Sequence, residues 1–138
     1  MTPEFQGLCP LLAVYDMTAA RAFYQVVLGF ETVQASPLVD APEGRFSHWV
    51  WLRRDGAELM LNTAYDEGER PAARVAEQDR WHRDATLYIG CADVDAMYAD
   101  LKAKGLDLAP PQTRPYGMRQ LTLTDPDGYG VCFQAPAD

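Results

Sequence analysis

The sequence predicts an α+β protein made of two tandem βαβββ modules, whose curved mixed sheets enclose a cleft. The main observation is an internal repeat, because the order of apolar runs and turn residues occurs twice along the chain. Asp16 and Asp93, which open the two predicted helices, lie 77 positions apart, and Gly29 and Gly105, which end them, lie 76 apart. A sheet with a helix on one face needs a cover on its other face, and two such sheets can supply it by enclosing a cleft.

The first module is predicted over residues 8–65. The side chain of Asp16 or Thr18 can cap the helix, and Gly29 lies where a left-handed C-terminal residue is expected. Apolar and β-branched runs between turn residues predict the strands. The predicted elements are a strand at 8–14, the helix between Asp16 and Gly29, a strand at 30–33, a Pro/Gly-rich loop, and a hairpin of strands at 46–52 and 57–61.

The second module is predicted over residues 85–135, after a polar linker at 66–84 that contains a short helix near 72–77. Asp125-Pro126-Asp127-Gly128 has the proline and glycine positions of a type I turn. The predicted elements are a strand at 86–91, a helix between Asp93 and Gly105, a short strand at 106–108, and a hairpin of strands at 120–124 and 130–134. With 138 residues, the two modules are expected to form a single domain, 1–138.

Composition excludes several classes of function. The chain has 12 Lys and Arg against 20 Asp and Glu, a net charge of −8, so we expect no nucleic-acid partner. No apolar run approaches the roughly 20 residues that a membrane-spanning helix needs, and no secretory signal is visible. The three cysteines, Cys9, Cys91 and Cys132, are too few for a disulfide framework. These features predict a cytoplasmic protein without a membrane partner.

Several short motifs recur in an order that resembles a known family. They are Val14-Tyr15-Asp16-Met17, Phe23-Tyr24, Leu28-Gly29-Phe30, Asp55-Gly56-Ala57-Glu58-Leu59, Tyr116-Gly117-Met118-Arg119 and Asp125-Pro126-Asp127-Gly128-Tyr129. Around a duplicated βαβββ unit, this set resembles the vicinal oxygen chelate superfamily, which includes glyoxalase I, extradiol dioxygenases and bleomycin-resistance proteins. The resemblance implies the glyoxalase/bleomycin-resistance fold and a homodimer.

The resemblance also implies where a metal would be held, because the family's enzymes take metal ligands from the first and fourth strands of each module. Here those positions fall on Cys9, Met60, Thr86 and Cys132. Hard divalent ions prefer carboxylate oxygen and imidazole nitrogen, which this set lacks. We therefore predict no metal and no cofactor, and a binding protein is favoured over an enzyme. A metal-dependent glyoxalase, lyase or dioxygenase with its ligands elsewhere stays an alternative.

Strand alternation predicts the lining of the cleft. In the first module it places Trp49, Trp51, Glu58 and Met60 on the cleft face, and a four-residue turn would set Trp51 opposite Glu58 and Trp49 opposite Met60. The corresponding face of the second module is predicted to carry Leu121, Leu123, Cys132 and Gln134, with Arg119 at its rim. Tyr65 and Tyr116 are expected at the mouth.

Two tryptophans beside the Glu58 carboxylate suit a flat aromatic molecule with a cationic group. The sequence therefore predicts a metal-free small-molecule-binding protein, resembling the bleomycin-resistance branch, that sequesters such a ligand. The expected ligand-binding residues are Trp49, Trp51, Glu58, Met60, Tyr65, Tyr116, Arg119 and Cys132. A module that senses a metabolite through the same cleft is a second alternative.

Overall fold

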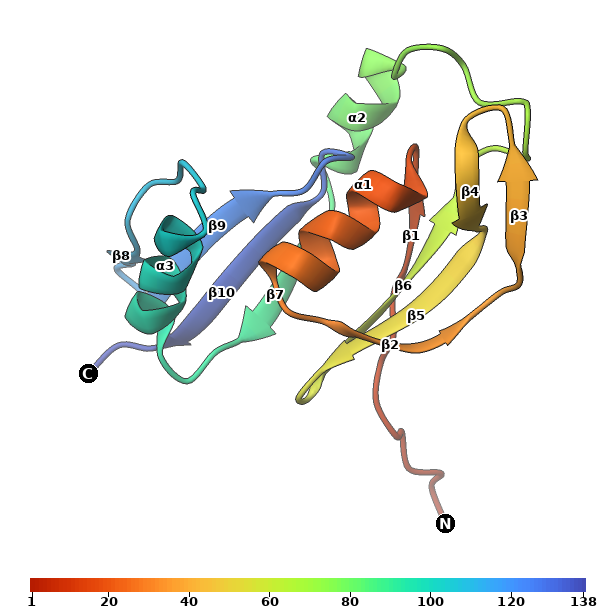
Figure 1. Cartoon of the computed structure of the whole chain (residues 1–138). Coiled ribbons are helices and arrows are strands. Elements are labelled where there is room, and N and C mark those ends of the chain that lie inside the picture. The colour runs from red at the N-terminus through yellow and green to blue at the C-terminus, as the bar shows by residue number, and fades with distance from the viewer. The chain divides into compact units, whose positions relative to one another are not determined.

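The computed structural model describes residues 1–138, which form two compact units, 1–70 and 71–138 (Figure 1). Each unit contains a four-stranded sheet with the same strand order, β1-β6-β5-β2 in the first and β7-β10-β9-β8 in the second. In each sheet the first strand runs parallel to its neighbour, while the other pairs are antiparallel. The predicted α+β class and the internal repeat are confirmed.

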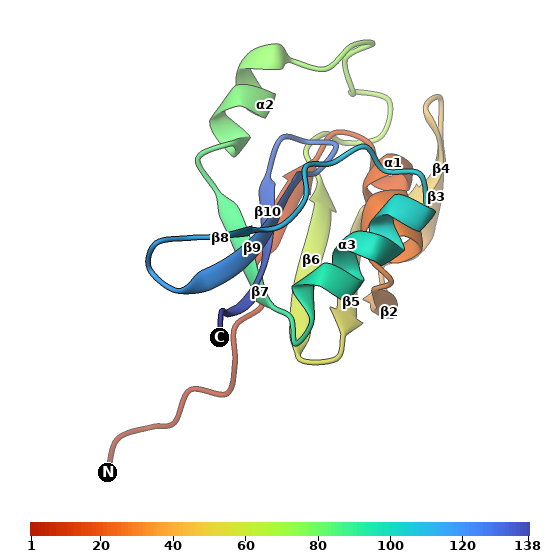
Figure 2. The ribbon, with the colours of Figure 1, turned by 90° about the vertical axis from the view of Figure 1, so that its left-hand side faces the viewer.

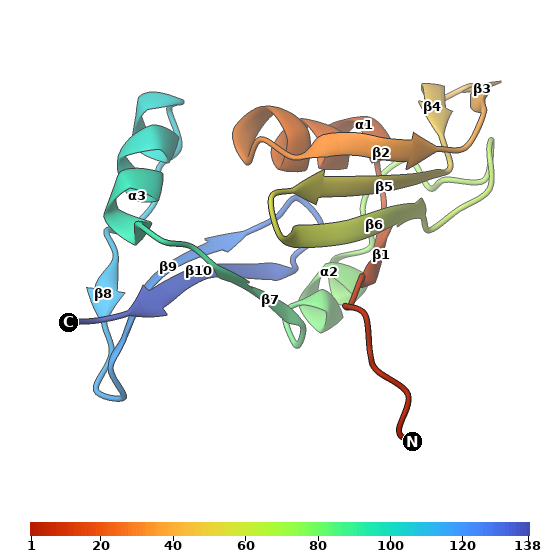
Figure 3. The same cartoon turned by 90° about the horizontal axis from the view of Figure 1, so that it is seen from below.

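The first unit places a helix on one face of its sheet, and Figure 3 shows β2, β5 and β6 side by side. Its elements are β1 (Leu11–Val14), α1 (Met17–Arg21), the π-helix η1 (Ala22–Val27), β2 (Glu31–Ala35), β3 (Leu38–Ala41), β4 (Gly44–Ser47), β5 (Trp49–Arg54) and β6 (Ala57–Thr63). β3 and the start of β4 occupy a segment that the sequence predicted as a loop, and residues 46–47 of the strand predicted at 46–52 belong to β4. Ala41 pairs with Gly44 there, so Pro42 and Glu43 form a two-residue turn.

The first helix begins and ends where the sequence predicts. The Asp16 carboxylate accepts a hydrogen bond from the Ala19 amide at 3.2 Å, and Gly29 has a φ of 77°. Between them, the Leu28 amide donates to the Phe23 carbonyl, five residues back, at 3.0 Å. The π-helical turn therefore accommodates the one residue by which this helix exceeds that of the second unit.

The second unit can be followed in Figure 2. Its elements are α2 (Ala76–His82), β7 (Thr86–Gly90), α3 (Val94–Ala103), β8 (Gln112–Thr113), β9 (Met118–Thr124) and β10 (Gly130–Pro136). The Asp93 carboxylate caps α3 by accepting from the Ala96 amide at 2.9 Å, and Gly105 ends the helix with a φ of 90°. The predicted short strand at 106–108 is absent, and β8 forms the edge of the sheet instead.

The polar segment after residue 70 packs on the turn between β9 and β10 of the second unit. The His82 imidazole stacks on the Tyr129 ring at 4.2 Å between centroids, and its Nδ1 lies 2.7 Å from the Asp127 carbonyl oxygen. The Arg74 guanidinium donates to the Asp127 carboxylate at 3.0 Å. These contacts place residues 71–84 in the second unit, and the short helix lies at 76–82 rather than near 72–77.

Each unit buries its apolar side chains between its helix and one sheet face. In the first unit the most buried sheet residues are Leu12, Val14, Val50, Leu52, Leu59 and Leu61. In the second they include Leu121, Val131 and Phe133, which α3 covers with Val94, Met97 and Leu101. None of the helices has the length and apolar character needed to cross a bilayer.

Candidate functional site

The candidate site in the first unit is the sheet face opposite α1, which we call the tryptophan face. It is formed by Trp49, Trp51, Glu58, Met60 and Asn62. All five side chains are half-buried, while their neighbours along the same strands are almost completely buried under the helix. The strand alternation predicted from the sequence therefore gives the correct faces. Two indoles and a thioether form an apolar surface that this unit leaves uncovered.

The register of this hairpin differs from the prediction by two residues. Trp51 lies opposite Met60, and Trp49 lies opposite Asn62. The connection is a two-residue turn of Asp55 and Gly56 rather than a four-residue turn, and Asp55 adopts a φ of 49°. Because side chains alternate with a period of two, a shift of two residues changes the partners but keeps the face.

The Glu58 carboxylate is engaged within the protein. It accepts a hydrogen bond from the Trp51 indole Nε1 at 3.1 Å and lies 3.9 Å from an Arg53 guanidinium nitrogen. The same guanidinium lies 5.8 Å from the Trp51 ring centroid. Glu58 thus binds the edge of the indole, and Arg53 lies over its ring. The two charges compensate each other, so Glu58 does not present the uncompensated carboxylate that the sequence analysis expected.

The side chains at the family's metal positions do not suit a hard divalent ion. Within the first unit, Met60 on β6 lies beside Leu11 on the parallel strand β1. The Cys9 thiol interacts electrostatically with the Glu58 carboxylate. Burial, with the Glu58 charge as a second cause, raises the pKa of the Cys9 thiol. Burial likewise raises the pKa of the Cys132 thiol in the second unit, against a smaller opposing effect of Arg114.

Protonated thiols are poor metal ligands, and a thioether and the Thr86 hydroxyl add no anionic oxygen. No group of three or more His, Cys, Asp and Glu side chains is placed to hold a metal ion. The donor set therefore does not fit the family's metal.

The matching surface of the second unit is polar, and we call it the glutamine face. It is formed by Gln120, Thr122, Cys132 and Gln134. Gln120 is 6% exposed, and its amide nitrogen donates to the Gln134 amide oxygen at 3.1 Å. Cys132 is almost fully buried.

The predicted lining of this face is wrong in part. Leu121 lies opposite Phe133 on the face that α3 covers, and Leu123 shares that face. Five residues, 125–129, separate β9 from β10, so Cys132 pairs with Thr122 and shares its face. The prediction had combined residues that point to opposite sides of β9.

Arg119 also lies on the helix-covered face rather than at the rim of the glutamine face. Its guanidinium donates two hydrogen bonds to Asp95, at 2.7 and 2.8 Å, in the first turn of α3. These bonds hold the pKa of the Asp95 carboxyl below its ordinary value. The geometry gives Arg119 a structural partner within the unit.

The two tyrosines lie in different surroundings. Tyr116 is 68% exposed, and its hydroxyl donates to the Gln120 amide oxygen at 3.1 Å, so it lies beside the glutamine face. The same oxygen accepts from the Arg114 guanidinium at 3.2 Å. Sequence reasoning missed Arg114 and Gln120, although the alternation that places Cys132 and Gln134 on one face could have placed Gln120 with them.

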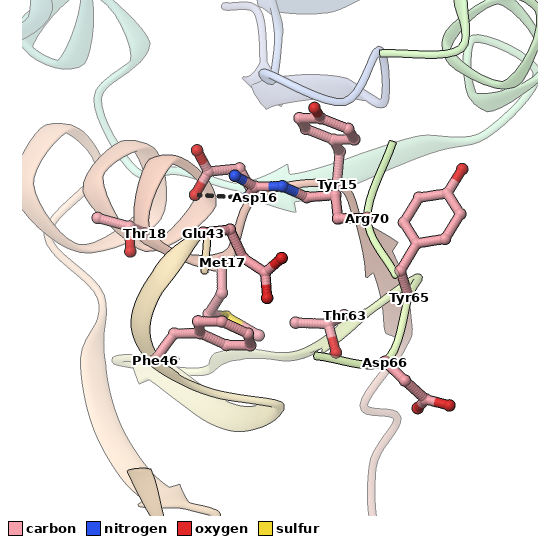
Figure 4. Close-up of a pocket in the computed structure, with 10 residues that line it drawn as sticks. All are labelled: Tyr15, Asp16, Met17, Thr18, Glu43, Phe46, Thr63, Tyr65, Asp66 and Arg70. Atoms are coloured by element: carbon pink, nitrogen blue, oxygen red, sulfur yellow. Dashed lines mark ion pairs between the residues drawn. The ribbon is translucent and has the colours of Figure 1, made fainter. Parts of the chain in front are cut away.

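Tyr65 lines a pocket that includes none of the tryptophan-face residues. Its volume is about 20 Å³, which is space for a single water-sized group. Figure 4 shows the Glu43 carboxylate turned toward Thr63, and the Asp16–Arg70 ion pair, 3.8 Å long, at one side. The other residues that line it are Tyr15, Met17, Thr18, Phe46 and Asp66. The pocket is too small for a drug-sized ligand in this form.

Comparisons with known proteins agree on the family and the fold. The family model for the glyoxalase/bleomycin resistance protein/dioxygenase superfamily matches residues 9–133. A comparison with curated proteins gave no match.

Among solved structures, TnmS3, an antibiotic binding protein from Streptomyces sp. CB03234, is 25% identical with a TM-score of 0.66, over 99% of this chain and 100% of that one. TioX from Micromonospora sp. ML1 is 20% identical with a TM-score of 0.70, over 95% and 99%. Lactoylglutathione lyase from Agrobacterium tumefaciens is 20% identical with a TM-score of 0.65, over 95% and 94%. At 20% identity, the last two bear on the fold alone.

Proposed function

The chain belongs to the glyoxalase/bleomycin resistance protein/dioxygenase superfamily, and we propose that it binds a small aromatic molecule and holds it without chemical change. TnmS3, with which the chain shares 25% identity over nearly its whole length, is an antibiotic binding protein, and this likeness supports the proposal. Binding of this kind would protect a cell from an aromatic antibiotic by sequestration. Trp49, Trp51 and Met60 are the proposed contact residues, because they lie on the tryptophan face that the first unit leaves uncovered.

The tryptophan face is the observation that carries this proposal. Trp51 is held by the Glu58 carboxylate and flanked by Arg53, so its ring needs little reordering when a flat molecule stacks on it. Stacking on a tryptophan contributes about 0.5–1.5 kcal/mol beyond the burial of area. Glu58 then acts by positioning Trp51, and the cationic ligand expected from the sequence is no longer needed to explain a carboxylate on this face.

The donor set favours binding over metal-assisted catalysis. The positions that would hold the family's metal carry two thiols of raised pKa, a thioether and a hydroxyl. Hard divalent ions bind such groups weakly. We therefore expect purified chain to hold less than about a tenth of an equivalent of Mn, Fe, Ni, Cu or Zn. Elemental analysis after incubation with each metal and desalting measures this, and stoichiometric metal would favour the metal-dependent alternative.

The test of binding uses tryptophan fluorescence with a panel of aromatic antibiotics. Trp49→Ala and Trp51→Ala are expected to weaken binding by more than about 1 kcal/mol, or roughly fivefold in Kd. Trp81→Phe is the matched control, because Trp81 is 62% exposed on α2, in the other unit. Mass spectrometry of the recovered ligand is expected to find it unchanged. Equal affinity in wild type and both alanine variants would refute the tryptophan face as the binding surface.

A further inference from the structure

Arg114 is a half-buried cation beside the glutamine face whose guanidinium has only neutral partners. Its Nε donates to the Gln120 amide oxygen at 3.2 Å, and its Nη1 donates to the Gln112 amide oxygen at 2.9 Å. No carboxylate of its unit forms an ion pair with it. In a chain with 20 acidic and 12 basic residues, this guanidinium is held by amide oxygens rather than by a carboxylate.

The other half-buried arginines of this unit are paired differently. Arg74 lies 3.0 Å from the Asp127 carboxylate, and Arg119 lies 2.7 Å from that of Asp95. Both therefore have their charge compensated where they pack. Arg114 alone among the three keeps an uncompensated charge.

Gln120 fixes the direction of the Arg114 guanidinium. The Gln120 side chain is 6% exposed, and its amide nitrogen is held by the Gln134 amide oxygen. Its oxygen consequently faces the Arg114 Nε and the Tyr116 hydroxyl. A guanidinium carries five N–H groups, so the two bonds of Arg114 leave the others to point at a ligand. The short turn at 114–117, closed by the Gly117 amide donating to the Arg114 carbonyl, keeps Arg114 and Tyr116 together.

We infer that Arg114 is the anion-recognition residue of the second unit, and that it binds the carboxylate of a planar aromatic acid. The guanidinium can offer paired N–H groups to the two carboxylate oxygens, and the exposed Tyr116 ring can lie against the aromatic part. The inference rests on the proposed small-molecule function, and it specifies the class of ligand as acidic rather than cationic. Burial raises the pKa of the Cys132 thiol on this face, and the charge of Arg114 opposes that rise as the smaller cause.

The test compares two probes of nearly the same shape, 2-naphthoate, which carries a negative charge, and its neutral amide, 2-naphthamide. Titrations of the full-length ¹⁵N-labelled chain, followed by NMR, give a Kd for each probe and report on the Arg114 Nε–H resonance directly. Wild type is expected to prefer the carboxylate by about tenfold, the factor that one good charge-assisted interaction supplies. The Arg114 Nε–H resonance is expected to shift only with the carboxylate.

Arg114→Gln is expected to bring the two Kd values within about twofold while leaving the amide affinity unchanged. Arg83→Gln is the matched control, because Arg83 is an exposed arginine of the same unit, and it should keep the wild-type preference. Arg114→Lys retains the charge without the planar fork, so an intermediate preference is expected. It also serves as the second variant if Arg114→Gln does not fold.

The inference would be overturned by equal Kd values for both probes in wild type, or by a carboxylate preference that survives in Arg114→Gln. Absence of saturable 2-naphthoate binding to wild type would overturn it as well. The proposed function is judged separately by Trp49→Ala and Trp51→Ala with the antibiotic panel. Loss of binding in those variants, together with no effect of Arg114→Gln, would keep the function and refute the acidic ligand.

Discussion

Trp51 shows how a single side chain on an open sheet face can be held ready for a ligand. Its indole nitrogen is bonded to Glu58, and its ring is flanked by Arg53. Glu58 on β6 and Arg53 on β5 lie directly opposite each other, so the register of the hairpin brings the two charged groups together. Glu58, which the sequence predicts to be a ligand-binding carboxylate, therefore positions the Trp51 indole.

Substitution of Glu58 separates these two roles. Glu58→Ala removes the acceptor of the Trp51 N–H, and we expect weaker binding of neutral aromatic probes and a shifted tryptophan emission maximum. Glu58→Gln keeps an acceptor oxygen, so it should bind neutral probes nearly as wild type does, with stability changed by no more than about 1 kcal/mol. Fluorescence titration and urea unfolding measure both effects. If Glu58→Gln weakened only the binding of cationic probes, Glu58 would be a ligand contact after all.

At the scale of elements, the contact between α2 and the turn before β10 depends on a glycine. Gly128 has a φ of 93°, and a Cβ there would lie 2.3 Å from the Asp79 carbonyl oxygen. This approach explains why the segment after residue 70 packs on the second unit although its composition predicts a solvated linker. Polar side chains, Arg74 and His82, make the contact through directed bonds rather than through apolar area.

Gly128→Ala is expected to displace α2 and to destabilise the chain. Gly117→Ala is the matched control, because Gly117 has a φ of 88° and open space around it. Strain at positive φ alone costs roughly 1–2 kcal/mol, which both variants share. The clash with the Asp79 carbonyl should add about 1–3 kcal/mol to the Gly128 variant only. Urea unfolding of both variants measures the difference, and equal losses would contradict a close packing of α2.

At the scale of the whole molecule, each unit covers only one face of its sheet with its own helix. The tryptophan face is half-exposed within the first unit, and Leu11 beside it is 54% exposed. Tyr88, which pairs with Cys132 in the second unit, is 60% exposed. Apolar surfaces of this kind are typical of ligand sites and of contacts between subunits.

We expect the chain to form a homodimer, as the family resemblance implies. Sedimentation velocity at micromolar concentrations measures the mass, which should be twice that of the 15.4 kDa chain. Trp81→Phe should leave it unchanged, and a stable monomer at 50 μM or above would contradict the prediction. The same sample, measured with a bound antibiotic, shows whether ligand binding and assembly are coupled.

The sequence determined the features that depend on local chemistry. Asp16 and Asp93 predicted the two helix starts, and Gly29 and Gly105 predicted the ends, because capping and left-handed conformations involve neighbouring residues. The difference of one residue between the two helices was visible in the spacing. The spacing did not predict that the extra residue forms a π-helical turn, because that turn depends on how the helix packs on its sheet.

Tertiary structure decided which side chains meet. The register of each hairpin depends on the length and conformation of its turn, so Trp51 lies opposite Met60 rather than the predicted Glu58, and Cys132 lies opposite Thr122. The bond of Glu58 to Trp51 follows from that register, whereas Arg119 binds Asp95 on α3 and Arg114 binds Gln120 from the turn at 114–117. Sequence alone thus identified the family resemblance and the sheet face on which the tryptophans lie. Which charged groups are open to a ligand was decided by the tertiary structure, because a carboxylate or guanidinium is available only where no neighbour has bound it.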